Sequence, residues 1–232
     1  MQFKTSRAIN YSKNLLSSEF SKYIFASLIS AGAFLYIFAK LAEDLLENEL
    51  TRFDQIVINL LASLQGPQMT AFMKGVTQLG SSYVLIFVAL IAMYFLLRRR
   101  RQYVEGLFIL VALVGGWGLD VLLKGLFQRV RPDINRLVEV SGYSFPSGHA
   151  MVSIAFYGML AYMFFLNSKT IFYKIVIPII LIFLILLIGV SRIYLGVHYP
   201  SDVIAGFAGG GLWLSGCILA LHGFRYYKGK KI

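Results

Sequence analysis

Six long apolar stretches constrain the fold of this chain more than any other feature of its sequence. A helix needs about 20 mostly apolar residues to cross the hydrocarbon core of a bilayer. Stretches of about that length or longer cover residues 23–41, 69–97, 103–123, 149–166, 172–190 and 203–222. The sequence therefore predicts an all-α fold, a bundle of six transmembrane helices.

The composition favours a membrane protein over a soluble one. Hydrophobic residues make up 58% of the 232 residues and charged residues only 14%, against about 25% charged in soluble domains. A soluble core of this size cannot hide that excess, so lipid has to solvate much of the surface. Because no internal repeat or soluble-domain linker is visible, we expect one integral membrane domain over residues 1–232.

Two segments near the second apolar stretch depart from a simple span. Residues 53–64 are amphipathic and too short to cross the bilayer, so they predict a short interfacial helix between spans one and two. The stretch 69–97 is longer than a span needs and contains Lys74 and Gln78. We expect its first turns to stand outside the hydrocarbon.

The basic residues indicate the orientation in the membrane. The net charge of +11 comes mostly from residues in the short gaps between apolar stretches, including the arginines at 98–101. This distribution follows the positive-inside rule and argues against a nucleic-acid partner, which favours a basic stripe. With a cytoplasmic N-terminus, most of the 22 basic residues but only Glu19 and Glu105 of the 11 acidic residues fall on the cytoplasmic side. We expect a multi-pass protein of the cell membrane with both termini in the cytoplasm.

Three polar clusters lie at span ends on the opposite, outer side. The first closes span three at 124–132, the second opens span four at 145–149, and the third joins spans five and six at 191–202. Ionisable groups at membrane depth are costly and usually pair or serve function. Their convergence on one face predicts an active site on the outer face of the membrane.

The clusters contain residues that suit phosphate. Lys124, Arg131 and Arg192 bring three positive charges, whereas a phosphate monoester carries about −1.5 to −2. The planar fork of arginine matches two phosphate oxygens at once, and lysine acts as a point charge. These three residues are therefore candidate phosphate ligands.

The second cluster has the features of an anion-binding helix start. Pro146 suits the first position of a helix, which places Ser147, Gly148 and His149 at a helix N-terminus. Exposed backbone N–H groups there bind anions. Gly148 allows close approach of the backbone, and Ser147 can donate a hydroxyl hydrogen bond.

Two histidines and an aspartate supply the remaining chemistry. Asp202 follows His198 by four residues, with Pro200 expected to start the sixth helix between them. A carboxylate that holds one ring nitrogen leaves the other free as a nucleophile. His149 is then the candidate general acid for the leaving oxygen. A lone membrane histidine is more often an interhelical hydrogen-bond partner, which is our expectation for His222.

These residues form three sequence motifs in a fixed order. K-x6-RP lies at 124–132, PSGH at 146–149 and SR-x5-H-x3-D at 191–202. The chain therefore resembles the type-2 phosphatidic acid phosphatase superfamily, and its six-span layout extends the resemblance over 23–222. The resemblance implies a phosphohistidine intermediate on His198, protonation of the leaving group by His149 and orientation by Asp202. It also implies phosphate binding by Lys124, Arg131, Ser147, Gly148 and Arg192.

Within the family, the short termini and compact loops are similar to those of bacterial phosphatidylglycerophosphate and undecaprenyl-diphosphate phosphatases. We expect a lipid phosphate or diphosphate as substrate, with phosphatidic acid as a third candidate. Asp120, Asp133 and Glu139 lie near the site in sequence but lack the spacing of a metal cage. We therefore predict no metal and no cofactor.

Two other functions remain open at this point. A transporter places charged residues at helix ends around an anionic substrate, but these charges cluster on one face and no discontinuous helix is apparent midway through the bilayer. A lipid phosphotransferase would pass the phosphoryl group from His198 to an alcohol instead of water. The first half of that reaction is the same, so the residues allow both outcomes.

Overall fold

The computed structural model describes residues 2–98, 102–133 and 136–228, with side chains from residue 21 onward. The basic residues at 99–101, 230 and 231, which entered the topology argument, lie outside the described residues. The side chains of Lys4, Arg7 and Lys13 lie outside them as well.

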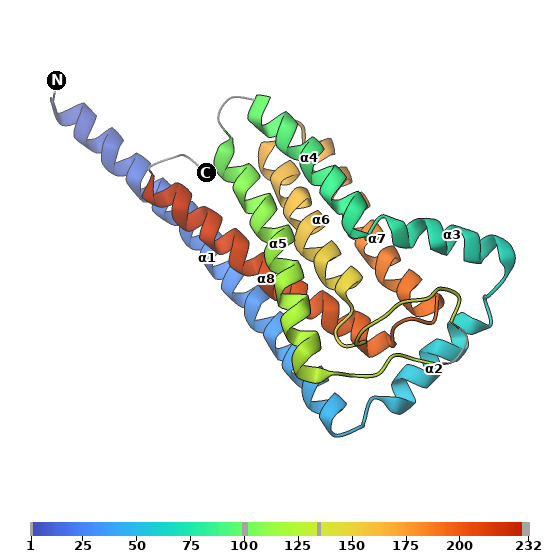
Figure 1. Cartoon of the computed structure of the whole chain (residues 1–232). Helices are drawn as coiled ribbons and strands as arrows, with labels where there is room; N and C mark the ends of the chain where they lie inside the picture. The colour runs from blue at the N-terminus through green and yellow to red at the C-terminus, as the bar shows by residue number, and fades with distance from the viewer. Residues whose placement is uncertain (1, 99–101, 134–135, 229–232) are drawn as a thin grey trace.

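The described residues form eight α-helices and no strand. Figure 1 shows them as a bundle with two shorter helices at one end. Their bounds are α1 Gln2–Leu46, α2 Thr51–Ala62, α3 Pro67–Gln78, α4 Ser82–Arg98, α5 Tyr103–Phe127, α6 Gly148–Asn167, α7 Ile171–Tyr194 and α8 Pro200–Tyr227. Five helices are long and apolar enough to cross a membrane, and the bent pair α3 and α4 would make a sixth span. The predicted all-α membrane bundle is confirmed.

The second span is bent within the apolar stretch that the sequence placed at residues 69–97. Helices α3 and α4 meet at 50°, and Gly80 lies in the break between them. A Cβ atom on Gly80 would lie 2.8 Å from Ile188 and 3.1 Å from His149. The missing side chain therefore lets the break pack directly against the start of α6. The sequence, which predicted only that the first turns of this stretch stand outside the hydrocarbon, did not reveal the bend because this contact is tertiary.

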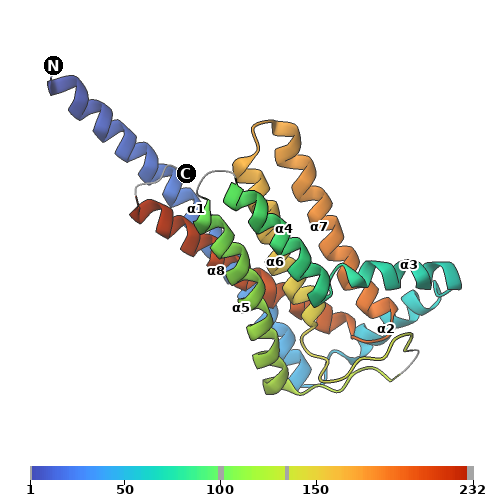
Figure 2. The same cartoon turned by 45° about the horizontal axis from the view of Figure 1, so that its top comes forward.

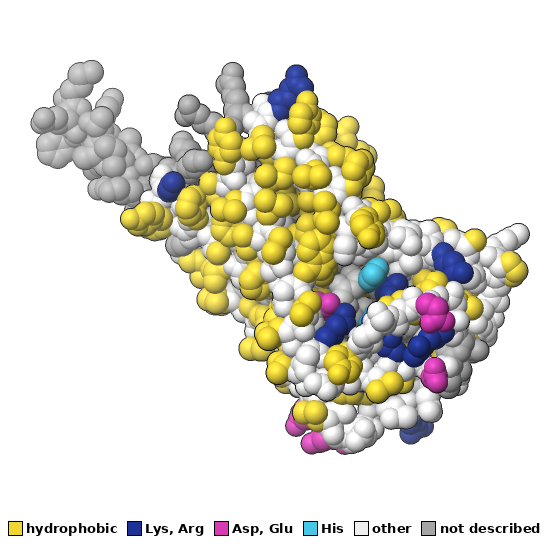
Figure 3. Space-filling view, viewed as in Figure 1, with side chains coloured by type: hydrophobic (Ala, Val, Ile, Leu, Met, Phe, Trp, Pro, Cys, Tyr) yellow, Lys and Arg dark blue, Asp and Glu magenta, His cyan; other side chains and the backbone are white. Residues whose placement is uncertain are grey.

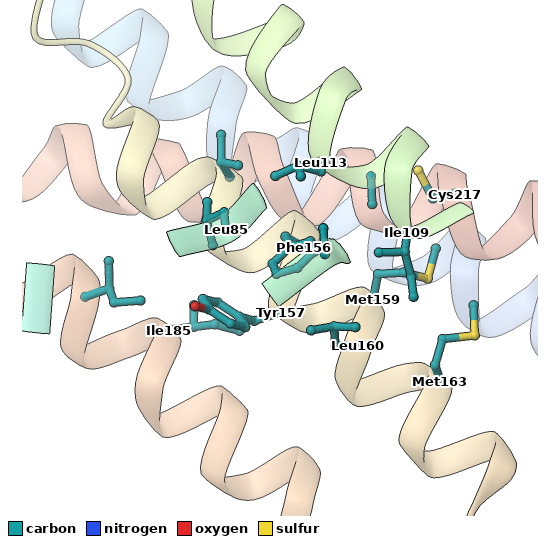
Figure 4. Close-up of a cluster of buried hydrophobic side chains, with 14 of the residues drawn as sticks. Leu85, Ile109, Leu113, Phe156, Tyr157, Met159, Leu160, Met163, Ile185 and Cys217 are labelled. Atoms are coloured by element: carbon teal, nitrogen blue, oxygen red, sulfur yellow. The ribbon is translucent and has the colours of Figure 1, made fainter. Parts of the chain in front are cut away.

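Helix α6 lies at the centre of the bundle, between α5 and α7 in both orientations (Figures 1 and 2). Its Phe156 and Met159 are fully buried in the largest hydrophobic cluster. Figure 4 shows side chains from the neighbouring helices around them, including Leu85 of α4, Ile109 of α5 and Ile185 of α7. This packing holds the N-terminal end of α6 in place.

Helix α8 approaches α6 closely because glycines line the contact. A Cβ atom on Gly206 would lie 2.6 Å from the carbonyl oxygen of Ser147, and one on Gly210 would lie 2.2 Å from that of Met151. Small residues four apart are a common means of close helix packing in membranes. The contact brings the first turns of α6 and α8 side by side.

The surface divides into an apolar flank and a polar end. Figure 3 shows hydrophobic side chains over the flank made by α4 and α5. Basic, acidic and histidine side chains gather around a hollow at the end where α2, α3 and the α5–α6 loop lie. The apolar flank suits lipid, and the hollow is the place to look for chemistry.

Candidate active site

Four helix ends bring the three predicted clusters together. Lys124 lies in the last turn of α5, Gly148 begins α6, Arg192 lies in the last turn of α7 and Asp202 lies in the first turn of α8. Helix α8 begins at Pro200, as predicted. The clusters are far apart in sequence, yet all of them lie at one end of the bundle (Figure 1).

His198 is buried in the loop before α8 and is held from both ring nitrogens. Its Nδ1 lies 3.3 Å from Oγ of Ser144 and 3.5 Å from Oδ2 of Asp202. Ser144 donates its hydroxyl hydrogen to the same Asp202 oxygen at 2.5 Å. Since that hydrogen is used, Ser144 can only accept from His198, which places the proton on Nδ1. The Nε2 atom then carries the free lone pair.

The position of Nε2 is defined by Arg131. Nη1 of Arg131 lies 3.0 Å from Nε2 and also donates to the carbonyl oxygen of Val197 at 2.8 Å. Nε of Arg131 donates to the carbonyl oxygen of Gly142 at 2.9 Å. These backbone acceptors fix the guanidinium in front of the histidine, and burial lowers the pKa of Arg131.

Burial also controls the charge of His198. Its removal from solvent lowers the pKa to about 4, although Asp202 favours the protonated ring. The positive charges of Arg131 and Arg192 act in the same direction as burial. The imidazole is therefore neutral near pH 7, as a nitrogen nucleophile has to be.

Opposite ends of two helices, α5 and α6, contribute an ion pair and a glycine to the site. Nζ of Lys124 lies 2.8 Å from Oδ2 of Asp120, one helical turn earlier on α5. A Cβ atom on Gly148 would lie 2.7 Å from the same Asp120 oxygen. Gly148 therefore lets α6 start directly beside the Lys124–Asp120 pair, and any side chain there would clash with it.

Three buried polar atoms of the residues described above have no hydrogen-bond partner within the described part of the chain. They are Nε of Arg192, Oγ of Ser147 and Oδ1 of Asp120. Nη1 of Arg192 donates to Oγ1 of Thr77 at 2.7 Å, which holds the rest of its guanidinium. Buried polar groups nearly always have partners. Two of the three, Nε of Arg192 and the hydroxyl of Ser147, are donors that an anionic ligand could satisfy.

The start of α6 differs in part from the prediction. Ser147 is the N-cap and α6 begins at Gly148, so Pro146 precedes the cap instead of occupying the first helical position. That prediction is wrong because the backbone of Ser147 is extended, so the helix begins only after it. The N–H of Ser147 donates to the carbonyl oxygen of Asp202 at 2.9 Å. The backbone N–H groups left for an anion are those of the first turn from Gly148.

His149 lies in that first turn and is partly exposed. Four groups are close enough to interact with it electrostatically, namely Arg192, His198, Lys124 and Arg131. The structure therefore places the second predicted histidine in the same polar pocket as the first.

Several residues of this region were missed by sequence reasoning. Ser144 bridges His198 and Asp202, and Arg129 pairs with Asp202 and with Asp54 of α2. A signal existed for Asp54, a lone acid within an amphipathic helix. Arg129 and Ser144 carried none, since both lie in loop segments without periodicity. Across the residues that the structure describes, no cluster of three or more His, Cys, Asp or Glu side chains suits a metal.

Comparison with known proteins assigns the family. Residues 105–226 match the model described as the PAP2 superfamily. Phosphatidylglycerophosphatase B of Bacillus subtilis is 34% identical over 175 residues, which cover 74% of this chain and 84% of that protein. An undecaprenyl-diphosphatase of Sulfolobus acidocaldarius is 29% identical over 198 residues, covering 84% and 89%.

A solved structure supports the same assignment. The crystal structure of a transmembrane PAP2-type phosphatidylglycerolphosphate phosphatase from Bacillus subtilis superposes with a TM-score of 0.78 and 30% identity. The match covers 85% of this chain and 96% of that one. The family match over residues 105–226 contains all eight predicted site residues. The chain is thus a multi-pass membrane phosphatase, a hydrolase of phosphoric ester bonds, and it belongs to the PAP2 superfamily.

Proposed function

We propose that this protein removes phosphate from a membrane lipid phosphate or diphosphate through a phosphohistidine on His198. The relatives named above are a phosphatidylglycerophosphatase and an undecaprenyl-diphosphatase, and both names describe lipid-linked substrates. The observation that carries the proposal is the unprotonated Nε2 of a neutral, buried His198, whose Nδ1 is held by Ser144 and Asp202. Nε2 lies 3.0 Å from Nη1 of Arg131, and the charge of Arg192 acts on the same ring.

In the first step, the phosphate enters the pocket and Nε2 of His198 attacks phosphorus. The bond between phosphorus and the leaving oxygen breaks, and protonated His149 gives its proton to that oxygen. Asp202 and Ser144 hold the Nδ1–H side of the ring while its positive charge develops. The groups proposed to bind the phosphate are Lys124, Arg131, Ser147, Gly148 and Arg192.

In the second step, water attacks the phosphohistidine. His149, now neutral, takes a proton from the water, the P–N bond breaks, and phosphate leaves with His198 restored. An alcohol in place of water would give the phosphotransferase reaction with the same atoms. Both steps develop negative charge on phosphate oxygens, which fixed cationic donors in a water-poor site stabilise.

We also propose that both termini are cytoplasmic and that the site faces outward. Single cysteines at Asp133 and Thr170 test this in a Cys217→Ala background. Asp133 is almost fully exposed at the site end, and Thr170 is exposed in the α6–α7 connection. An impermeant thiol reagent should label the first cysteine in intact cells and leave the second unlabelled. The reverse pattern would overturn the orientation.

Phosphate release by the purified protein tests the function. The substrates are phosphatidylglycerophosphate, phosphatidic acid and undecaprenyl diphosphate, each assayed with EDTA, with magnesium and with a labelled acceptor alcohol. We expect free phosphate from at least one lipid at the same rate in EDTA, since Lys124, Arg131 and Arg192 supply the positive charge. Transfer of label to the alcohol without free phosphate would assign a phosphotransferase, and no turnover of any lipid would refute the proposal.

A further inference from the structure

A buried network reaches Asp202 from α2, outside the residues proposed above. Arg129 donates Nη1 to Oδ1 of Asp202 at 2.6 Å and Nη2 to Oδ2 of Asp54 at 2.8 Å. Asp54 also accepts hydrogen bonds from the backbone N–H and the hydroxyl of Ser201, at 2.9 and 2.7 Å. Asp54 is 1% exposed and Asp202 is fully buried. The network therefore joins α2, the loop after α5 and the start of α8.

Arg129 uses the oxygen of Asp202 that does not face the nucleophile. Oδ2 accepts from Ser144 at 2.5 Å and from the N–H of Tyr199 at 2.9 Å, and it faces Nδ1 of His198. Oδ1 accepts from Arg129. A carboxylate bonded on both oxygens cannot rotate about its own axis without losing a charged hydrogen bond. The orientation of Oδ2 toward His198 thus depends on the partner of Oδ1.

The geometry of Arg129 depends in turn on Asp54. The guanidinium lies over the ring of Tyr199, 4.0 Å from its centroid, and its fork spans two carboxylates. Two carboxylates and one guanidinium leave one net negative charge, shared between Asp54 and Asp202. The more strongly Asp54 attracts Arg129, the more negative charge Asp202 retains for the imidazolium of His198. Arg129 and Asp54 together can therefore set both the position of the Asp202 carboxylate and the negative charge that it retains.

We propose that Arg129 and Asp54 are positioning residues for the nucleophile, with Arg129 fixing Asp202 and Asp54 fixing Arg129. This inference rests on the proposed function, because the pair acts only through His198. It connects the reaction to α2, whose other face exposes Phe53 and Ile56. The short helix is thus a structural support of the active site as well as a predicted interfacial segment.

The test compares full-length purified variants on the lipid that the wild type hydrolyses. Arg129→Gln removes the guanidinium that bonds both carboxylates, and Arg129→Lys keeps its positive charge. Asp54→Asn keeps the shape of the side chain and removes its negative charge. Arg52→Gln is the matched control, because it removes one arginine charge from an exposed position of α2, two residues before Asp54. For Arg129→Gln we expect kcat to fall about 10- to 100-fold with KM within about twofold. Arg129→Lys should recover part of the loss, and the control should match the wild type.

The pH profile separates positioning from simple structural support. The other titratable and charged groups that face His198 stay constant in these variants: Arg131 on the loop, His149 on α6, Arg192 on α7 and Asp202 on α8. Lys124 on α5, which faces His149, is unchanged as well. Removing Arg129 leaves the charge of Asp202 uncompensated, which favours imidazolium and moves the acidic limb of kcat/KM to higher pH. In Asp54→Asn, the charge of Arg129 is no longer shared with Asp54 and neutralises Asp202 more fully. This disfavours imidazolium and moves the acidic limb to lower pH. We expect each shift to be about half a pH unit or more.

Opposite shifts with a lower kcat support the inference. An unchanged kcat in Arg129→Gln, or a limb that stays in place or moves in the same direction in both variants, overturns it. If Arg129→Gln does not purify as a folded protein, the near-isosteric Asp54→Asn decides alone. In that variant a lower kcat with the limb at lower pH supports the pair, and wild-type behaviour overturns it. An inactive wild type, or an active His198→Ala, would instead refute the proposed function.

Discussion

The two ends of the bundle both bury ionisable groups, but they treat them differently. At the end away from the site, Arg225 of α8 pairs with Glu105 of α5 at 2.7 Å. At the site end, Arg131 and Arg192 are buried without a carboxylate partner among the residues that the structure describes. A buried charge is costly without a partner. The difference teaches that the buried arginine at one end is paired with a carboxylate within the protein, whereas the buried arginines at the other end suit a site that takes an anionic ligand.

The histidines repeat this contrast. His222 contacts the hydroxyl of Tyr162 through Nε2 and stacks on Tyr23 with ring centroids 4.2 Å apart, which confirms the expected interhelical role. His198 presents its Nε2 to an arginine instead. One ring joins helices, and the other faces a pocket with unpaired donors.

The largest effect should come from a comparison in which each of these two histidines is replaced separately. His198→Ala should lower kcat by about 10⁴-fold or more, because no other nucleophile replaces it. His222→Gln should keep kcat near the wild-type value and lower Tm by a few degrees. Initial rates and thermal unfolding of both purified variants check this. Substantial phosphate release from folded His198→Ala would remove the distinction between the two ends.

The arginines provide the next test. Arg192→Gln should reduce kcat/KM about 10²- to 10³-fold, because it removes a donor to the developing charge. Arg225→Gln should leave activity per folded molecule unchanged but destabilise the protein by about 3 kcal/mol, since Glu105 stays buried without its partner. Kinetics and denaturation should therefore give opposite rankings of the two variants. Equal losses of activity would contradict the contrast.

A smaller and selective loss should follow from His149→Ala. We expect about a 10²-fold lower kcat on a lipid phosphate, whose alkoxide is a poor leaving group. An activated aryl phosphate should lose much less, since its leaving group needs no proton. The ratio of the two losses measures the general-acid role, which an equal loss on both substrates would rule out.

The smallest expected effect is a displacement of the pH profile. Because burial lowers the pKa of His198 to about 4, the nucleophile is neutral above that pH and becomes protonated below it. The acidic limb of kcat/KM should therefore lie well below the ordinary histidine value of about 6.5. Asp202→Asn should move the limb still lower, because Asp202 favours the protonated ring. Rate profiles with a monoester and with a diphosphate check both shifts. An acidic limb that does not move in Asp202→Asn would mean that Asp202 does not act on His198.

The sequence by itself predicted the membrane bundle and the motif residues that lie together at one end of it, because those signals are local. The length of an apolar run predicts a span, and Pro200 predicts where α8 begins. The three motifs lie at helix ends, so a correct set of spans already places His149 and His198 on one face.

Only the tertiary structure decided how those residues are held. The bend at Gly80 depends on its contact with α6 and α7, and the ties of Asp202 to Ser144 and Arg129 come from loops whose conformation no periodic pattern reveals. The Nδ1 proton of His198 follows from the same contacts. Hydrophobic length acts within a segment, whereas hydrogen bonds between distant segments form only after packing has brought them together. The sequence therefore predicted that the residues of the three motifs meet, and the fold decided their geometry and the further residues that hold them.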